Sequence, residues 1–345
     1  MHEANGKRMV EEGMRVGRPF HVFLLDIVHL LGASLLALLW TLACAIRASL
    51  PSSLHWRKSV AQELVLVTGA GSGLGRQLAL KFARLGAKLV LWDINAEGNA
   101  ETARLLRTES EGAEAHAYVC DISKREDVYR VAELVKAEVG TVDILVNNAG
   151  IVTGKSFLSC PDELIEKTMA VNIMSHFWTV KAFLPRMLQR NHGHVVSIAS
   201  AAGLFGQVRL ADYSASKFAA VGFNESLGVE LMTDQKSGVH TTTVCPTYVD
   251  TGMFDGVKSR YPFLFPILHQ EYVAEKIVQA VLTNQEVLML PRFVYFVYFL
   301  KGLLPQKVGY YLGNAFAMTH AMDTFKGRGQ QQSSLSSSAI NGVKN

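Results

Sequence analysis

The chain has 345 residues, enough for one large α/β domain with additions and few for two full domains. Its net charge of +4 is weak, and no run of Lys and Arg is interleaved with aromatic side chains, which argues against a nucleic-acid partner. Hydrophobic residues make up 49% of the chain, a high share for a soluble globular protein, so a membrane segment is sought first.

The first element in chain order is an apolar segment over residues 22–46, interrupted by Asp26 and His29. Its uninterrupted part, residues 30–46, has 17 residues, which is near the lower limit for a bilayer-spanning helix. A cleaved signal peptide is the alternative, but its apolar region is normally only ~7–15 residues long. Length therefore favours an uncleaved membrane anchor. Basic residues lie on both sides, so charge does not predict its orientation.

From Glu63 onward, short apolar runs alternate with helix-length segments. Strands are expected at residues 64–67, 88–92, 115–119, 144–146, 194–198, 241–244 and 287–290. Helices are expected between them, for example at residues 76–85, 124–138 and 162–168. This alternation predicts a single α/β domain built on a Rossmann-type, doubly wound parallel sheet of about seven strands.

Four parts are predicted along the chain: a membrane anchor and linker (1–58), the Rossmann domain (59–290), a C-terminal apolar or interfacial segment (291–326) and a disordered Gln- and Ser-rich tail (327–345). The aromatic stretch 293–300 is too short to span a bilayer. It can lie in a membrane interface, cap a lipid-binding cleft or form an ordinary core helix. The four cysteines have neither C-x-x-C spacing nor a nearby His cluster, which predicts isolated thiols.

A glycine-rich turn, T-G-A-G-S-G-L-G at residues 68–75, follows the first strand and precedes a helix. A strand, such a turn and a helix N-terminus together form an anion site, because backbone N–H groups and the helix dipole face the ligand. Glycine also lets the backbone approach a pyrophosphate closely. Dinucleotide contacts are therefore expected at Gly69, Ser72, Gly73, Leu74 and Gly75.

Asp93 ends the second strand, 18 residues after Gly75. An acid that binds the adenosine ribose is expected about 20 residues after the glycines. A carboxylate there accepts hydrogen bonds from ribose hydroxyls and repels a 2′-phosphate, so it favours NAD over NADP as the cofactor. The alternative is a helix N-cap, because Asp is a favoured N-cap residue and a helix can start just after it.

Tyr213 and Lys217 form a Y-x-x-x-K pair, whose members lie on one face of a helix. A free tyrosine has a pKa near ~10. A nearby cation lowers that pKa, so the pair suits proton transfer to or from an alcohol oxygen. The spacing alone is weak, but its context is informative. Ser200 lies 13 residues earlier at a strand end, Asn172 lies 28 residues before Ser200, and N-N-A-G at 147–150 follows the fourth strand.

In this order and spacing, T-G-A-G-S-G-L-G, N-N-A-G, the strand-end serine and Y-S-A-S-K resemble the short-chain dehydrogenase/reductase family over about residues 60–290. The resemblance implies that Tyr213 is the general acid/base and that Lys217 lowers its pKa and holds the nicotinamide ribose. It implies that Ser200 donates to the substrate oxygen and that Asn172 orders a water linking the site to solvent. It further implies cofactor contacts at Asp121, Asn148 and Thr251, although Pro246-Thr247 departs from the family's Pro-Gly.

Longer stretches such as L-V-L-W-D-I-N and V-N-N-A-G-I-V-T-G resemble the membrane-bound retinol and 17β-hydroxysteroid dehydrogenases. This implies NAD-linked turnover of a lipophilic alcohol, with a retinoid expected first and a steroid as the alternative. The resemblance implies that the protein is located at the endoplasmic reticulum membrane or a lipid droplet, with its catalytic domain facing the cytosol. It is also compatible with a homodimer. A non-enzymatic membrane scaffold is the rival from another class, and four intact catalytic residues argue against it.

Two further patterns complete the sequence-based expectations. His192 and His194 form H-x-H without a third ligand nearby, so no metal site is predicted. An apolar group lies where this family places its substrate lid, although such side chains can equally belong to the core. The group consists of Phe254, Tyr261, Phe263, Phe265 and Leu268.

Overall fold

The computed structural model describes residues 20–49, 56–109 and 113–327. The chain divides into two compact units, Met1–Arg57 and Lys58–Asn345. The predicted disordered tail lies, apart from Gly327, outside the described residues.

In the first unit, the structure describes residues 56–57 and one 30-residue helix, α2 (Phe20–Ser49). Leucine, isoleucine and valine side chains are exposed on all of its turns from residue 24 to residue 42, and Leu36, for example, is 69% exposed. Over the residues that the structure describes, no helix meets the combined length and apolarity needed to cross a membrane.

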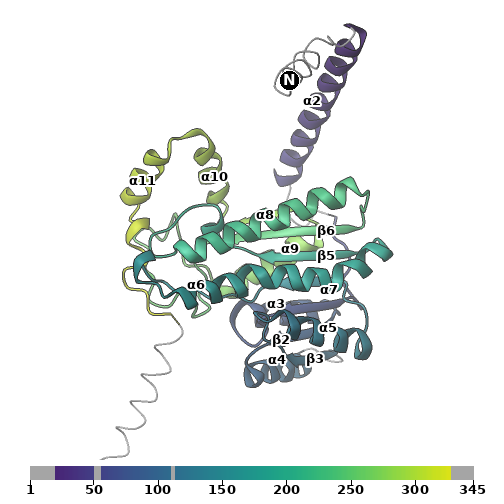
Figure 1. Ribbon diagram of the computed structural model, residues 1–345, viewed down its shortest axis with the longest axis vertical. Helices are drawn as coiled ribbons and strands as arrows, with labels where there is room; N and C mark the ends of the chain where they lie inside the picture. Colours follow the sequence, from purple (N-terminus) through teal and green to yellow (C-terminus); the bar gives the residue numbers. More distant parts are fainter. Residues whose placement is uncertain (1–19, 50–55, 110–112, 328–345) are drawn as a thin grey trace, which may run out of the picture. The chain divides into compact units, whose positions relative to one another are not determined.

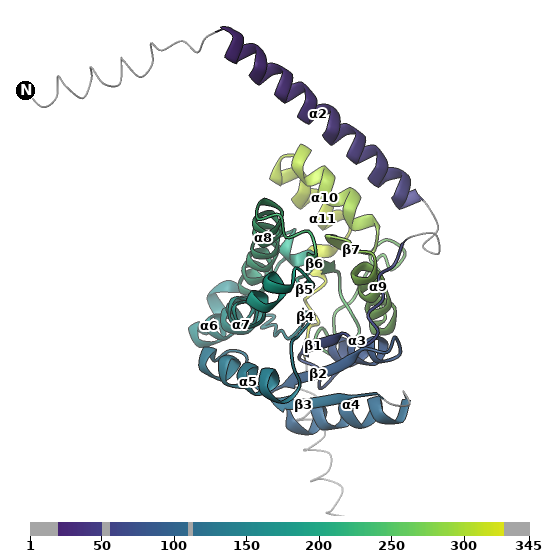
Figure 2. The same ribbon diagram turned by 90° about the vertical axis from the view of Figure 1, so that its right-hand side faces the viewer.

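The second unit contains a seven-stranded sheet (Figure 1) with the order β3-β2-β1-β4-β5-β6-β7, which can be followed in Figure 2. All neighbouring strands are parallel. The strands are β1 (Leu64–Thr68), β2 (Lys88–Asp93), β3 (Ala115–Val119), β4 (Ile144–Asn147), β5 (Gly193–Ile198), β6 (Val239–Pro246) and β7 (Val287–Leu290). Each contains one of the predicted runs, so the predicted doubly wound sheet is confirmed. The strand order reverses between β1 and β4, where such folds bind ligands.

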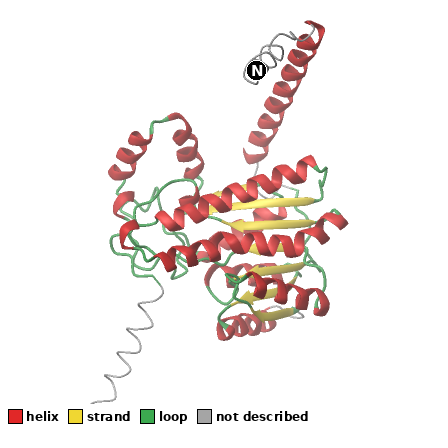
Figure 3. Ribbon diagram, viewed as in Figure 1, coloured by secondary structure: helices red, strands yellow, loops and turns green. Residues whose placement is uncertain are grey.

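Helices cover both faces of this sheet (Figures 2 and 3). One face carries α3 (Gly73–Ala83), α4 (Ala96–Glu109) and α9 (Gln270–Leu282). The other carries α5 (Arg125–Glu138), α7 (Ser175–Arg190) and α8 (Ala211–Thr233), with α6 (Asp162–Met169) and the π-helical turn η3 (Ala170–Met174) leading into α7. Strands with near-continuous apolar runs are expected when both faces are covered.

The strands divide their side chains between two cores by simple alternation. Val65 and Leu89 pack on the α3 side of the sheet, whereas Leu66 and Val90 pack on the α5 side. All four are fully buried. Because the central strands are buried on both faces, their carboxyl ends form a rigid edge on which loops can hold functional groups.

The second unit begins at the opposite, amino-terminal edge of the sheet. The Lys58 backbone N–H donates to the Leu282 carbonyl (2.8 Å), and Lys58 Nζ donates to His194 Nδ1 (2.9 Å) near the start of β5. His194 Nε2 lies 2.8 Å from Thr242 Oγ1. Burial lowers the pKa of Lys58 to about 8, partly offset by the nearby Glu63 carboxylate.

Two short helices follow β7, namely α10 (Phe293–Leu303) and α11 (Gln306–Ala315). The predicted aromatic stretch 293–300 lies in α10, where Val294 is buried and Phe299 is 64% exposed. The chain then returns to the domain through the short helical turn η5 (Met318–His320) and the residues after it.

Candidate active site

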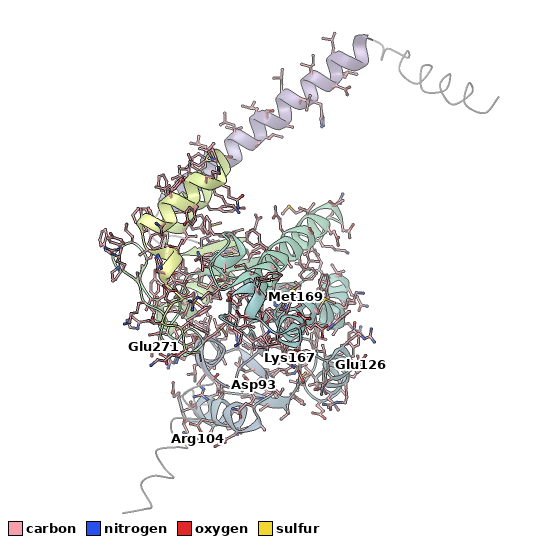
Figure 4. All side chains as sticks on the ribbon, turned by 60° about the vertical axis from the view of Figure 1, so that its left-hand side comes forward. Asp93, Arg104, Glu126, Lys167, Met169 and Glu271 are labelled. Carbon is pink, nitrogen blue, oxygen red and sulfur yellow. The ribbon has the colours of Figure 1, made fainter. Side chains whose placement is uncertain are left out.

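A cleft of about 370 Å³ opens at the carboxyl ends of the strands, on either side of the point where the strand order reverses. All the predicted site residues except Gly73 and Asn172 line it: Gly69, Ser72, Leu74, Gly75, Asp93, Asp121, Asn148, Ser200, Tyr213, Lys217 and Thr251. Residues from position 69 to position 251 of the sequence are therefore brought into one site. Asp93 from β2 and Lys167 from α6 are labelled in Figure 4.

The glycine-rich turn has no room for side chains at its centre. Gly69 has a φ of +67°, a left-handed conformation that favours glycine. A Cβ atom on Gly75 would lie 2.1 Å from the Gly69 carbonyl oxygen and 2.6 Å from Asn148 Nδ2. The turn is thus a bare backbone cradle at the N-terminus of α3, with a shape and polarity that fit a dinucleotide pyrophosphate.

The N-N-A-G turn is attached to the end of β1 by hydrogen bonds. Asn148 Nδ2 donates to the Thr68 carbonyl (2.8 Å), and Thr68 Oγ1 accepts from the backbone N–H groups of Asn148 (3.0 Å) and Ala149 (3.1 Å). Thr68 is therefore a residue of the site's framework that the sequence reasoning did not single out. Its position as the first letter of T-G-A-G-S-G-L-G was the available signal.

Asp93 bridges the glycine-rich turn and the loop that follows β2. Its Oδ2 accepts from the Gly71 N–H and its Oδ1 accepts from the Asn95 N–H, both at 2.8 Å. Asn95, rather than Asp93, caps the next helix. Its Oδ1 accepts from the Gly98 N–H (3.0 Å) in the first turn of α4.

Asp121 lies at the end of the cleft near β3 and is surrounded by donors. Burial alone would raise the pKa of its carboxyl, but hydrogen bonds from Ser123 and the charges of Lys167 and Lys124 hold that pKa below its ordinary value. Lys167 also donates to Ser123 Oγ (2.7 Å). Sequence reasoning missed Lys167, because one lysine on a polar helix face carries no distinguishing pattern.

Tyr213 and Lys217 both project from α8 and are almost fully buried, at 4% and 3% exposure. Burial raises the pKa of the Tyr213 phenol, and a hydrogen bond with Ser200 acts in the opposite direction. Lys217 Nζ donates to the Ile198 carbonyl (2.7 Å) and lies 5.7 Å from the centre of the Tyr213 ring. Burial lowers the pKa of Lys217 to about 8, while the nearby Cys245 acts to raise it. Burial of the phenol thus acts against the phenolate form of Tyr213.

Ser200 follows β5 and has two roles. Its Oγ accepts from the Ala202 N–H (3.1 Å), which caps a short helical turn, and it also lines the cleft beside Tyr213. Its hydroxyl lies 3.4 Å from the Pro246 carbonyl oxygen.

Asn172 is buried in the π-helical turn η3 and does not line the cleft. Its Oδ1 accepts from the Ile151 N–H (2.9 Å), and its Nδ2 donates to the Ile151 carbonyl and to Ser216 Oγ, each at 3.0 Å. The Asn172 carboxamide thus joins the loop after β4 to α8. Single π-helical turns such as η3 are frequent at functional sites.

The predicted lid residues separate in the structure. Phe254 packs edge-to-face on Tyr213, with ring centres 5.8 Å apart. Tyr261 and Phe265 instead contact Phe316 after α11, and Phe263 is 95% exposed. Leu268 belongs to the sheet core, the other interpretation considered for this group.

The C-terminal segment joins, unexpectedly, the apolar cluster that contains Tyr213. Ala321 and Met322 are buried in the same apolar cluster as Tyr213, and Phe325 packs against this cluster. The Lys326 N–H donates to the Asp255 carbonyl (2.8 Å), which holds the returning chain in place. Sequence reasoning treated this part only as an apolar or interfacial segment, because no local pattern indicates a contact with Tyr213 more than 100 residues away.

In the part of the chain that is described, the cysteines form no disulfide and the histidines belong to no metal-ligand cluster. Cys120, Cys160 and Cys245 are buried free thiols. Across the described ranges, no three His, Cys, Asp or Glu side chains are arranged to hold a metal ion.

Comparisons with known proteins agree with this geometry. A family model described as short chain dehydrogenase matches residues 63–262. Epidermal retinol dehydrogenase 2 of Homo sapiens is 55% identical over 295 residues, which cover 86% of this chain and 93% of that protein. Retinol dehydrogenase 10 of Rattus norvegicus is 51% identical over 274 residues, 72% of this chain and 80% of that protein.

A solved structure shows the same architecture. The crystal structure of a short chain dehydrogenase/reductase from Burkholderia phymatum in complex with NAD superposes with a TM-score of 0.64 at 28% identity, covering 70% of this chain and 94% of that one. Given the family match over more than half of the chain, the relatives and the shared cleft, this protein belongs to the short-chain dehydrogenase family.

Proposed function

We propose that this protein is an NAD(H)-dependent dehydrogenase that interconverts a lipophilic alcohol and its carbonyl compound, with all-trans-retinol and retinal as the first candidates. The main observation in support is that the glycine-rich cradle lines the same cleft as Tyr213, Lys217 and Ser200. Two relatives at 51–55% identity carry the name retinol dehydrogenase, which supports the choice of substrate.

The chemistry assigned to the chain's own residues is a proton transfer. A bound nicotinamide ring accepts or supplies the hydride. During alcohol oxidation Tyr213 takes the hydroxyl proton, and during carbonyl reduction it returns that proton to the oxygen. Ser200 donates a hydrogen bond to the same oxygen and stabilises the charge that builds there. Lys217 in its charged form favours the phenolate and holds the ribose of the cofactor.

Asp93 supports the preference for NAD over NADP. Its carboxylate lines the cleft at the end of β2 and is held by the Gly71 and Asn95 N–H groups. A 2′-phosphate on the ribose would bring two negative charges together in a partly buried site, which disfavours NADP. Asp121, Asn148 and Thr251 complete the proposed contacts with the cofactor.

The substrate end supports a long apolar molecule. Phe254 and Met322 surround Tyr213 with apolar surface, and Phe325 packs against the same cluster. A polyene chain gains free energy by entering such a slot, about 25 cal/mol per Å² of apolar surface removed from water. A steroid gains similarly, so a 17β-hydroxysteroid is the second candidate.

The test compares kcat/KM for all-trans-retinol and oestradiol, each with NAD and with NADP, using full-length protein in membranes. Retinol with NAD is expected to be turned over best, and Tyr213→Phe is expected to lower kcat at least ~100-fold with cofactor binding retained. A tenfold preference for the steroid, about 1.4 kcal/mol, would replace the retinoid. Absence of turnover with every alcohol would favour a non-enzymatic scaffold.

We also propose that the protein is membrane-attached, at the endoplasmic reticulum or a lipid droplet, with residues 59–290 as its catalytic domain facing the cytosol. Two features support this: the exposed apolar side chains of α2, and the exposed aromatic side chains of α10 and α11. Between Glu286 and Asp323 the chain has no acidic residue but carries Arg292, Lys301 and Lys307, which suits an anionic lipid surface.

Carbonate extraction of full-length protein tests this attachment, with Phe296→Ser/Phe299→Ser on α10 and Met232→Ser on α8 as a matched exposed control. Wild type and control are expected to stay in the pellet. If full-length wild type is released by carbonate, attachment through either segment is refuted. Sedimentation of the detergent-solubilised protein tests whether it forms a homodimer.

A further inference from the structure

The helix α10 has a fixed side and a free side. Its first turn is fixed to the sheet, because Val294 is buried and the Tyr295 hydroxyl donates to a carbonyl of β7 (2.8 Å). On its free side, Phe296 is 54% exposed and Phe299 is 64% exposed. The surrounding residues 287–322 include basic but no acidic side chains, which suits contact with anionic lipid.

Lys301, in the last turn of α10, joins this helix to the segment after β5. Its Nζ donates to the Leu204 carbonyl (2.6 Å) and lies 4.9 Å from the centre of the Phe218 ring and 5.9 Å from that of Phe205. Tyr298, on the same side of α10, meets the Phe205 ring edge-on, with ring centres 6.2 Å apart. Ammonium groups are attracted to the faces of aromatic rings, so one hydrogen bond and two ring contacts hold the Lys301 side chain in place.

The residue that Lys301 contacts, Leu204, belongs to the turn that carries the catalytic serine. Ser200 is the N-cap and Leu204 the C-cap of the short helical turn η4 (Ala201–Gly203). Within it, the Gly203 N–H donates to the Ser200 carbonyl (2.8 Å). A Cβ atom on Gly203 would lie 2.6 Å from a backbone carbonyl oxygen of α8, so η4 is packed directly against that helix. A shift of Leu204 therefore displaces Ser200 relative to α8, which carries the proposed proton donor.

We propose that Lys301 is a positioning residue that couples contact between α10 and a lipid surface to the placement of Ser200. Burial of Phe296 and Phe299 in lipid restrains α10, because it removes apolar surface from water. Lys301 passes this restraint to Leu204 and so to the hydroxyl that donates to the substrate oxygen. The inference rests on the proposed function and adds to it a dependence of turnover on lipid.

The test is a mutant cycle in full-length protein reconstituted into vesicles of phosphatidylcholine and phosphatidylserine. Phe296→Ser/Phe299→Ser removes the apolar contact with lipid, Lys301→Met removes the link to η4, and a further variant combines these changes. Lys301→Met is expected to lower kcat at least ~10-fold with the KM and the NADH affinity little changed, because a small misplacement of reacting groups is costly. The serine variant is expected to lower kcat as well. The combined variant is expected to be no slower than Lys301→Met, because both changes act through one link.

Lys276→Met on α9 is the matched control. Lys276 Nζ lies 5.5 Å from the centre of the Tyr272 ring and donates to Gln279 Oε1 (3.2 Å), so it makes the same kinds of contact as Lys301. Because α9 covers the other face of the sheet from α8, this variant is expected to keep the wild-type kcat. Lys301→Arg, which keeps the charge and can donate to the same carbonyl, is expected to retain most of the activity.

Hydrogen–deuterium exchange measures the coupling without turnover. The N–H groups of Leu204 and Phe205 both donate to the Ala201 carbonyl, at 2.9 and 3.0 Å, so their exchange reports how often the turn opens. In the same vesicles, exchange at these amides is expected to accelerate in Lys301→Met and in the serine variant, and to stay at the wild-type rate in the control.

The proposal is overturned by wild-type exchange rates in Lys301→Met, by losses of kcat that multiply in the combined variant, or by a control that loses as much as Lys301→Met. If the wild type turns over no alcohol, the proposed function has failed, and the exchange rates alone decide the coupling. If Lys301→Met does not fold, equal exchange in wild type and in the serine variant overturns the proposal.

Discussion

Replacing Gly75 with alanine tests the bare-backbone cradle directly. The added Cβ would lie 2.1 Å from the Gly69 carbonyl oxygen and 2.8 Å from its carbonyl carbon, both backbone atoms that cannot rotate away. Overpacking of this kind costs about 1–3 kcal/mol. The alanine recovers up to about 1 kcal/mol of helix propensity, because Gly75 lies in the first turn of α3.

The free-energy cost of the clash therefore exceeds the gain in helix propensity. The turn must move away from the position that receives the pyrophosphate. NADH titration by fluorescence is expected to show at least a tenfold weaker affinity, which corresponds to about 1.4 kcal/mol. Gly222→Ala is the matched control, because a Cβ on this glycine of α8 meets nothing within 4 Å. An unchanged NADH affinity in Gly75→Ala, with the fold intact by circular dichroism, would refute the cradle as the phosphate site.

Three further predictions concern charge. Asp93→Ala is expected to reduce the preference for NAD over NADP at least tenfold in kcat/KM, and a wild-type enzyme that already prefers NADPH would contradict the assignment. The reduction rate is expected to decline above about pH 8 as Lys217, whose pKa burial lowers to about 8, loses its proton, and Lys217→Arg should remove this limb if it remains active. Burial holds the pKa values of His176, His194 and His240 below the ordinary value in the folded state. Unfolded chains therefore take up protons first as pH falls below ~6.5, and each ring should cost at most about 1.4 kcal/mol of stability per pH unit below that point. Urea unfolding at pH 7.0 and 5.5 measures this loss, and equal stability at the two values would contradict it.

The sheet was predictable because its central strands are buried on both faces and so read as short apolar runs. The limits of β6 were not. This strand spans Val239–Pro246, whereas the run predicted from the sequence covers only residues 241–244. It therefore includes His240 and Pro246, which are not apolar strand-forming residues, so periodicity could not assign them to the strand.

The cofactor side of the cleft was predictable for a different reason. Close approach of backbone to ligand requires glycines in a local order, and the sequence displays that order at Gly69 and Gly75. The substrate side was not, because Phe254 packs on Tyr213, and Met322 and Phe325 join the same cluster, through tertiary contacts that leave no short-range pattern. Leu268 shows the same limit, since its apolar character fits a lid and a core equally well.

The position of Lys58 has a consequence for how such enzymes can be altered. This residue fastens the start of the second unit to the amino-terminal edge of the sheet, through Leu282 and His194, whereas the cleft opens at the carboxyl edge. Segments of different length or destination can therefore be joined before Lys58 without changing any residue of the cleft. The arrangement therefore offers a route to join this active site, unchanged, to segments of other kinds.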